Sequence, residues 1–447
     1  MTLPHTSHFS LTGQISFDIH DNMVALRYPS HHIKNIGFIS TRIAGTDGVS
    51  LEIQKWADVL ERNRYNCFYF AGSLDRPRKR SFLMKEAHFE HPLIQEIERD
   101  LFGKRTRTSQ TSETIQEIKD KLKGALYHFV KKYDVDLIIP ENALAIPMNI
   151  PLGLAITEFI AETGIPTIGH HHDFPWERER FLINSCGDYL NMAFPPDLPS
   201  IQHVVINSLA SEQLSFRRGI SNIVVPNVLD FATEPPPLDD YCSDLRERIG
   251  LEKDDLFILQ PTRVVPRKWI ERSIEIVRNM NLANPVLVIS HAADDEGDDY
   301  YVRVQDYSRN MGVKIVHIDH LISSQRGISE TGDKLYSIAD IYQSADLVTY
   351  PSGHEGFGNA FLEAIYYQKP IVVNRYSIYI ADIEPVGFDV IVMDGFVSTR
   401  AITEINRVLK DKNRLDAMVE RNYEIGESYF SYEVLEEKLM HVIRTFG

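Results

Sequence analysis

The feature that most constrains this chain is an alternation, from about residue 35 to the end, of short β-branched segments with longer amphipathic ones. Such alternation is typical of parallel sheets whose strands are joined by crossover helices. A first series of expected strands comprises Asn35–Ser40, Asn66–Phe70, Asp136–Pro140, Thr167–His170, His203–Asn207 and Asn222–Val225. A second comprises Leu256–Pro261, Pro285–Ser290, Lys314–Ile318, Leu347–Tyr350, Pro370–Asn374 and Asp389–Met393. The pattern predicts an α/β protein with two doubly wound, Rossmann-like sheets.

A proline-rich segment separates the two series. It contains Glu234-Pro235-Pro236-Pro237, which cannot continue a helix or a central strand. The alternative is a surface loop inside one large domain. The expected organisation is an N-terminal edge hairpin at 1–34, a first domain at 35–229, a linker at 230–240, a second domain at 241–426 and a C-terminal helix at 427–447 that packs back on the first domain.

Bulk properties exclude several classes of partner. A net charge of -16 disfavours binding to nucleic acid and to anionic lipids. No apolar run reaches the roughly 18 residues of a membrane span, and the N-terminal residues lack the basic segment followed by an apolar one that is typical of a signal peptide. Cys67, Cys186 and Cys242 are scattered, which favours buried thiols in a reducing compartment. We therefore expect a cytoplasmic protein without nucleic-acid or integral-membrane partners. A homodimer is possible.

A glycine-rich loop follows the strand at Leu347–Tyr350 and leads into a helix that begins near Asn359. Its glycines allow backbone amides to approach an anion at the start of a helix, where the helix dipole favours negative charge. The expected contacts with a phosphorylated donor come from Gly356, Phe357, Gly358 and Asn359.

Two glutamates accompany this loop. Glu355 lies within it, and Glu363 lies one to two turns into the helix among apolar neighbours. A carboxylate in such surroundings is costly unless it is hydrogen-bonded, and the two hydroxyls of a ribose would be suitable partners. The alternative is a structural glutamate that caps backbone amides.

Basic residues follow the first strand of the second series. Arg263, Arg267 and Lys268 stand at its carboxyl end, where open α/β sheets bind ligands. Alone, such a loop is more typical of a solvated turn. Next to a glycine-rich helix start, the cations would offset the charge of a diphosphate.

The first domain offers a weaker glycine loop. Gly45, Asp47 and Gly48 precede a helix expected to begin near Val49, whose amides would point into a cleft between the domains. A plain turn explains the pattern equally well. Further along, residues 73–115 contain a basic cluster at 76–80 and are predicted to form a solvated loop.

Three consecutive histidines, His170 to His172, end another expected strand and precede Asp173. Neighbouring residues on a strand point to opposite sides, so the three cannot share one metal ion. A zinc site of His170, His172 and Asp173 lacks helical spacing and a nearby fourth ligand, and we expect no metal. A hydrogen bond from an imidazole to a sugar hydroxyl or to the reacting centre is favoured over an exposed polar loop. The acidic run Asp294–Asp299 is interpreted as a solvated loop.

The residues from Tyr350 to Glu363 resemble glycosyltransferase family 4, the retaining GT-B family that includes sucrose and sucrose-phosphate synthases and bacterial mannosyl- and glucosyltransferases. The resemblance spans about residues 36–440. Its hallmark is two glutamates around glycines, met here by Glu355 and Glu363 in EGFGNAFLE. This sequence departs from the family pattern at two places. Trp269 replaces the glycine that usually follows Lys268, and the segment Pro226–Asp230 lacks the family's glycine.

The resemblance implies roles for particular side chains. Glu355 would contact the donor sugar and Glu363 the ribose, Arg263 and Lys268 would bind the diphosphate, and His172 with Asp173 would match the family's His-Asp pair. The leaving phosphate oxygen would take the acceptor's proton, which makes Glu355, Arg263, Lys268 and His172 the expected catalytic set. Gly48 would approach the donor. The expected acceptor-binding residues are Gly45, Asp47, Arg42, His170 and Asp173.

The expected activity is transfer of glucose or mannose from a nucleotide-diphosphate sugar, with UDP-glucose and GDP-mannose as leading donors. No cofactor or divalent cation is expected to be required. The acidic balance favours a small soluble sugar, polyol or sugar-acid acceptor, and Arg42 with the basic cluster at 76–80 could bind an anionic one. The alternatives are a nucleotide-sugar epimerase, a sugar phosphorylase or a non-catalytic binding protein.

Overall fold

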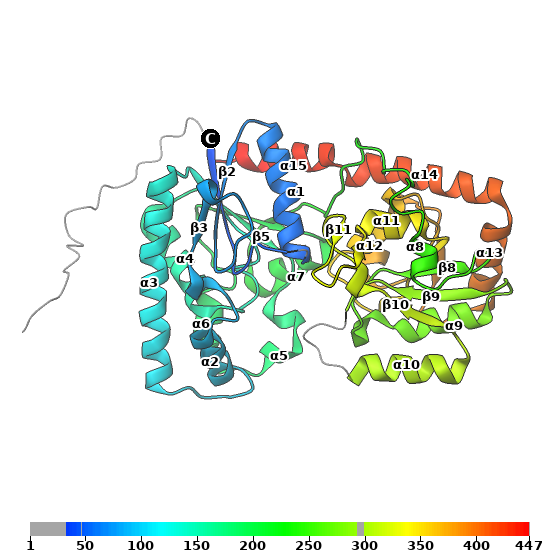
Figure 1. Ribbon diagram of the computed structural model, residues 1–447. Helices are drawn as coiled ribbons and strands as arrows, with labels where there is room; N and C mark the ends of the chain where they lie inside the picture. Colours follow the sequence, from blue (N-terminus) through cyan, green and yellow to red (C-terminus); the bar gives the residue numbers. More distant parts are fainter. Residues whose placement is uncertain (1–32, 46, 293–298, 447) are drawn as a thin grey trace, which may run out of the picture.

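The computed structural model describes residues 33–45, 47–292 and 299–446. Nearly all of the hairpin expected at 1–34, and the run Asp294–Asp298, lie outside the described residues. Figure 1 shows two lobes side by side, the first in blue to green and the second in green to orange.

The first lobe is built on a parallel sheet of seven strands in the order β3-β2-β1-β4-β5-β6-β7. Helices cover both faces, because alternate residues of the strands enter two separate cores. In β1, Ile36 and Phe38 face one core and Ile39 faces the other. The strands are β1 (Asn35–Ile39), β2 (Asn66–Ala71), β3 (Ser81–Leu83), β4 (Leu137–Pro140), β5 (Thr167–His171), β6 (Ile201–Val205) and β7 (Asn222–Val224).

Four helices of the first lobe begin where polar side chains cap free backbone amides. Asp47, Thr108, Asn149 and Asn207 cap α1, α3, α4 and α7. The helices are α1 (Gly48–Arg62), α2 (Pro92–Leu101), α3 (Ser109–Tyr133), α4 (Ile150–Thr163), α5 (Glu179–Leu182), α6 (Gly187–Ala193) and α7 (Ser208–Arg218).

The second lobe repeats the arrangement with six parallel strands in the order β10-β9-β8-β13-β14-β15. These are β8 (Leu256–Gln260), β9 (Pro285–Ile289), β10 (Ile315–His317), β13 (Leu347–Tyr350), β14 (Ile371–Asn374) and β15 (Ile391–Met393), with a separate pair β11 (Gly327–Ile328) and β12 (Lys334–Leu335). Its helices are α8 (Leu245–Arg248), α9 (Ile270–Asn279), α10 (Asp299–Met311), α11 (Ile338–Ser344), α12 (Asn359–Tyr366), α13 (Thr399–Lys410) and α14 (Lys412–Phe430). The two sheets confirm the predicted α/β architecture.

The prediction of a solvated loop over residues 73–115 was wrong. This segment contains β3, which pairs in parallel with β2, then α2 and the start of α3. Ile94, Ile97 and Leu101 recur every three or four residues along α2 and are buried against the first sheet. The basic composition of residues 76–80 obscured this periodicity, which begins only after them.

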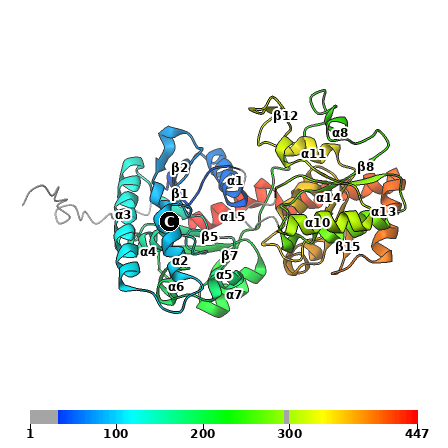
Figure 2. The ribbon, with the colours of Figure 1, turned by 60° about the horizontal axis from the view of Figure 1, so that its bottom comes forward.

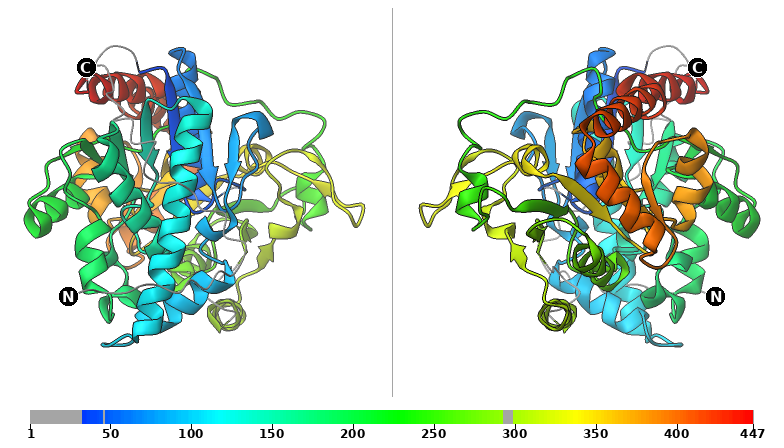
Figure 3. Two further views of the ribbon diagram at one scale, coloured as in Figure 1. Left: turned by 90° about the vertical axis from the view of Figure 1, so that its left-hand side faces the viewer. Right: turned by 90° about the vertical axis from the view of Figure 1, so that its right-hand side faces the viewer.

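The last helix, α15 (Tyr432–Arg444), returns to the first lobe. Its apolar face, including Leu435 and Leu439, packs in one core with Trp56 and Leu60 of α1. Figures 1 and 2 show α15 beside α1, and the right-hand view of Figure 3 shows α14 leading into it. None of the helices in the described residues has the length and apolar content needed to cross a membrane. The three cysteines are buried and unpaired.

Candidate active site

The glycine-rich loop joins β13 to α12 in the second domain, and close packing fixes its path. Gly358 has a φ of 132°, and a Cβ atom there would lie 2.4 Å from Oη of Tyr376. A Cβ atom on Gly353 would lie 2.5 Å from the indole of Trp269. Both positions therefore require glycine, because any side chain would displace a neighbouring aromatic group.

Glu355 is the central charged residue of this loop. It is only 7% exposed, and its carboxylate lies between two cations. Nζ of Lys268 donates to Oε1, and Nη1 of Arg267 donates to Oε2 at 2.9 Å. The amide of Gly353 also donates to the carbonyl of Arg267 at 2.9 Å, which ties the glycine loop to the basic loop after β8.

The charges of this group influence one another. Burial, with help from Arg267 and Arg263, lowers the pKa of Lys268 to about 8, although Glu355 acts in the opposite direction. Burial raises the pKa of Glu355, but Lys268 and Arg267 outweigh it, so the net shift is downward. The group therefore has an ionised carboxylate and an excess of positive charge at the loop that precedes α12.

Trp269 performs the conformational role of the glycine it replaces. Its backbone has a φ of 50° and a ψ of 45°, in the left-handed region that favours glycine. It links the short 3-10 turn at Pro266–Lys268 to α9. The loop therefore keeps the backbone path that a glycine would allow.

Glu363 lies in α12 and is partly buried. Its Oε2 accepts a hydrogen bond of 2.8 Å from Oη of Tyr342 in α11, whose ring stacks on Tyr367. Burial raises the pKa of the Glu363 carboxyl, against the opposing effect of Tyr342. Within the described residues, the side chain of Glu363 is hydrogen-bonded to this hydroxyl. Glu363 therefore does not cap backbone amides, which was the alternative to a role in binding a ribose. Sequence reasoning missed Tyr342, since nothing near it in the sequence marks it.

In the first domain, the consecutive histidines divide between the two faces of β5. His170 and His172 lie on one face beside Glu141, which follows β4 and is fully buried. Nε2 of His172 lies 2.5 Å from Oε1 of Glu141, and Nδ1 of His170 lies 2.8 Å from the same oxygen. On the other face, His171 shares a hydrogen bond of 2.8 Å with His203. Sequence reasoning missed Glu141, although its place after a fully apolar strand was an available signal.

Asp173 stands apart from this cluster. It accepts hydrogen bonds from Asn142 at 2.9 Å and from Nε of Arg178 at 2.6 Å, while the amide of His172 donates to Asn142 at 3.1 Å. Glu141 rather than Asp173 thus joins the two histidines into a group that could hold a metal ion. The contact between His172 and Glu141 is a hydrogen bond, whereas Nδ1 of His170 lies 2.8 Å from the same oxygen without the geometry of one.

The two sites face each other across the domain interface. A Cβ atom on Gly356 would lie 3.7 Å from the carbonyl oxygen of His172. Nδ2 of Asn207 donates to the carbonyl of Gly356 at 2.7 Å, and Nδ2 of Asn227 donates to Oδ1 of Asn359 at 2.7 Å. The structure therefore brings the end of β5 onto the glycine loop, as expected where the carboxyl ends of two open sheets meet.

The N-terminal glycine loop lies beside α1. Asp47 caps this helix by accepting from the amides of Val49 and Ser50, and the amide of Gly45 donates to Asp75 at 2.8 Å. These contacts give Asp47 and Gly45 structural roles. Nε of Arg42 lies 3.3 Å from Asp47, and its guanidinium stands over the ring of Phe89. Gly48 forms the first residue of α1.

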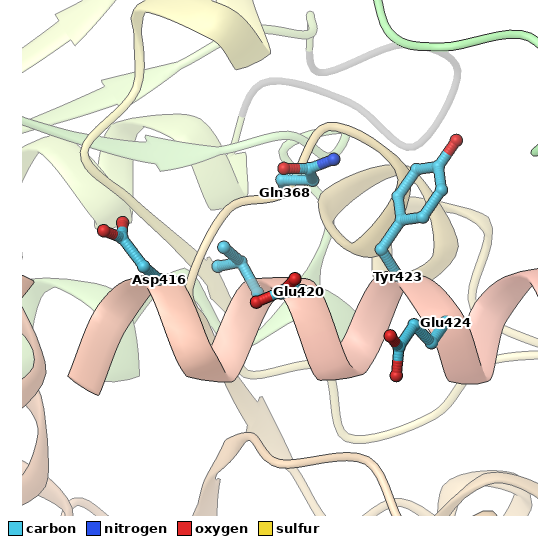
Figure 4. Close-up of a pocket in the computed structure, with 6 residues that line it drawn as sticks. Gln368, Asp416, Glu420, Tyr423 and Glu424 are labelled. Atoms are coloured by element: carbon cyan, nitrogen blue, oxygen red, sulfur yellow. The ribbon is translucent and has the colours of Figure 1, made fainter. Parts of the chain in front are cut away.

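A surface hollow elsewhere on the second domain does not suit the expected donor. Figure 4 shows it between Gln368 and one face of α14, with Tyr423 at one side. Its carboxylates, from Asp416, Glu420 and Glu424, would repel a diphosphate.

Comparisons with known proteins agree with this geometry. A family model described as "Glycosyl transferases group 1" matches residues 330–425, which include the glycine loop and both glutamates. The mannosylglucosylglycerate synthase of Thermotoga maritima is 31% identical over 438 residues, which cover 90% of this chain and 98% of that protein. The protein of the same name from Petrotoga mobilis is 31% identical over 442 residues, with 88% and 98% covered.

Solved structures show the same fold. Sucrose-phosphate synthase from Thermosynechococcus elongatus superposes with a TM-score of 0.62 at 15% identity, covering 92% of this chain and 98% of that one. Anabaena HepE in complex with UDP and glucose superposes with a TM-score of 0.60 at 14% identity, covering 92% and 100%. The chain therefore belongs to the family of GT-B glycosyltransferases that includes the mannosylglucosylglycerate synthases.

Proposed function

We propose that this protein is a retaining hexosyltransferase that moves mannose from a nucleotide-diphosphate donor, GDP-mannose first, to a small anionic acceptor of the glucosylglycerate class. Two relatives named mannosylglucosylglycerate synthase, each covered over 98% of its length, support this donor sugar and acceptor. UDP-glucose is the second donor candidate.

The observation that carries the proposal is the group formed by Glu355, Lys268 and Arg267 beside the glycine loop. Glu355 belongs to the loop that leads into α12 and stands four residues before the helix begins at Asn359. A diphosphate bound there would meet both the cations and the oriented N–H groups of the helix start. Such donors stabilise charge that develops on the leaving phosphate. Glu363 would bind the ribose, and His172 would reach the sugar from the opposite domain.

The same group supports retention. An inverting reaction needs a carboxylate or imidazole that removes the acceptor's proton. Glu355 is a poor base, since its two cationic partners hold its pKa below the usual range. In the proposed reaction the acceptor oxygen forms a bond to the anomeric carbon, the bond from that carbon to the phosphate oxygen breaks, and a phosphate oxygen takes the proton on the same face.

The test supplies purified protein with GDP-mannose or UDP-glucose and with either glucosylglycerate or glucosylglycerol, in which an uncharged CH2OH replaces the carboxylate. We expect a mannosylated product with glucosylglycerate, detected by mass spectrometry, whose anomeric configuration by NMR matches that of the donor. We propose that no divalent cation is required, so EDTA should leave the rate unchanged. Equal use of both acceptors would refute anionic recognition, and an inverted product would refute retention.

A further inference from the structure

Glu141 is held rigidly at the carboxyl end of β4. Its amide donates to the carbonyl of Ile39 at 2.8 Å, and Oγ of Ser40 donates to its carbonyl at 3.1 Å. Both of its backbone groups are therefore bound to the neighbouring end of β1. Its side chain is fully buried and has no freedom to reach solvent.

The carboxylate of Glu141 is used on one side only. Oε1 meets Nε2 of His172 and Nδ1 of His170, while Oε2 is buried without a hydrogen-bond partner among the described residues. Burial of a carboxylate is expensive, and an apolar side chain of similar size is often neutral or stabilising in its place. A contribution to stability therefore does not explain why a carboxylate stands here.

The two imidazoles that Glu141 meets differ in access. The side chain of His170 is 1% exposed and stacks on Trp56 with ring centroids 4.0 Å apart, so it belongs to the core. The side chain of His172 is 12% exposed and belongs to the end of β5 that meets Gly356. Because Glu141 occupies Nε2 of His172, the nitrogen that remains for a ligand is Nδ1.

We propose that Glu141 is a positioning residue for sugar transfer: by holding Nε2 of His172, it presents Nδ1 of the same ring to a hydroxyl of the sugar bound between the domains. This inference rests on the proposed function. Glu141 itself touches no substrate and acts only through His172.

The charges around His172 shift the pKa of its imidazole upward on balance. Burial lowers this pKa. The hydrogen bond and the charge of Glu141 raise it, with smaller contributions from Glu52 of α1 and from Asp173, and together they outweigh burial. His170 is a further titratable neighbour, with its ring centroid 4.7 Å from that of His172. Replacing Glu141 with glutamine would remove the largest upward effect and leave the shape of the side chain.

A double-mutant cycle tests this role. We expect Glu141→Gln to lower kcat on the order of 10²-fold, the loss that a displacement of about 1 Å can cause, with donor and acceptor KM nearly unchanged. Because Glu141 acts through His172, the double variant with His172→Gln should be no slower than His172→Gln alone. Losses that multiply, or a Glu141→Gln variant with normal kcat, would overturn the proposal.

His203→Gln is the matched control, since it breaks the buried pair with His171 on the opposite face of the same strand. It should lower Tm and leave kcat close to that of the unsubstituted protein. An equal loss of kcat in this control would assign the effect to disruption of β5 rather than to Glu141.

A second measurement separates this inference from the proposed function. In ¹⁵N-histidine NMR, the signal absent from His172→Gln identifies the ring, and it should titrate at lower pH in Glu141→Gln. An unchanged titration would overturn the positioning contact even in active protein. Absence of transfer by the unsubstituted protein with every donor, combined with the expected titration shift, would overturn the proposed reaction and retain the contact.

Discussion

Both domains place a buried carboxylate between two groups that can carry positive charge, but the partners differ. In the second domain Glu355 lies between Lys268 and Arg267, which leaves an excess of positive charge. In the first domain Glu141 meets only imidazoles, and its Oε2 has no partner within the described residues. The difference matches two ligand chemistries: a diphosphate requires positive charge, whereas sugar hydroxyls require oriented hydrogen bonds. The two halves should therefore respond differently to loss of charge.

The largest expected effect tests the charged half of the site, which is the group of Glu355, Lys268 and Arg267 in the second domain. Lys268→Ala removes a cation next to the proposed diphosphate and should lower turnover on the order of 10²-fold, as losing one preorganised donor does. Steady-state kinetics with the productive donor measures it. Near-normal turnover would place the diphosphate elsewhere.

Lys369→Ala is the matched control for that variant. Lys369 is also a lysine whose pKa burial lowers to about 8, but it donates to the carbonyl of Gln343, and it lines a hollow away from the glycine loop. It should lower Tm and leave turnover unchanged. A turnover loss equal to that of Lys268→Ala would assign the effect to stability.

The second prediction uses the pH dependence of the same lysine. Its pKa is lowered to about 8, so the free enzyme carries this charge below pH 8 and loses it above. We expect kcat/KM for the donor to fall about tenfold per pH unit above about pH 8, because kcat/KM reports the ionisation of the free enzyme. Lys268→Arg keeps its charge throughout this range and should remove the fall, whatever its absolute rate. A decline that persists in this variant would belong to another group.

Much of the charged half could be predicted from the sequence, because its elements are local. The strand before Pro351, the glycines and the helix start at Asn359 follow one another along the chain, and backbone chemistry dictates each. The pairing of Lys268 with Glu355 could not be predicted, since the two residues are 87 positions apart. The sequence predicted that both residues contact the donor, but it did not predict that they contact each other.

The first domain was less predictable for the same physical reason. His170 and His172 were candidates because they adjoin in the sequence, but Glu141 joins them from the neighbouring strand, about 30 residues earlier. Strand order decides which chain ends meet, and no local pattern encodes it. Similarly, α2 was hidden because a basic cluster dominated the composition of its segment.

The third prediction concerns the nucleotide. Glu363→Gln should weaken binding of the nucleoside diphosphate about tenfold, which corresponds to one lost hydrogen bond to a charged group, and calorimetry measures the change in Kd. Tyr342→Phe is the control: it removes the hydroxyl that donates to Glu363 but keeps the carboxylate. It should therefore change Kd less than Glu363→Gln does. Unchanged affinity in Glu363→Gln would remove its role at the ribose.

The smallest expected effect tests whether the first domain also uses charge, at the acceptor. Arg42 stands over Phe89, and its Nε lies 3.3 Å from Oδ2 of Asp47, so its terminal nitrogens could bind a carboxylate. Arg42→Gln should raise KM for glucosylglycerate about fivefold, the size of one partly exposed ion pair, without affecting donor KM. Arg80→Gln is the control, because Arg80 is paired with Glu61. Equal KM changes in the two variants would show only a long-range charge effect. A specific change in Arg42→Gln would mean that the first domain combines hydrogen bonding to the sugar through His172 with a separate cation for the acid group.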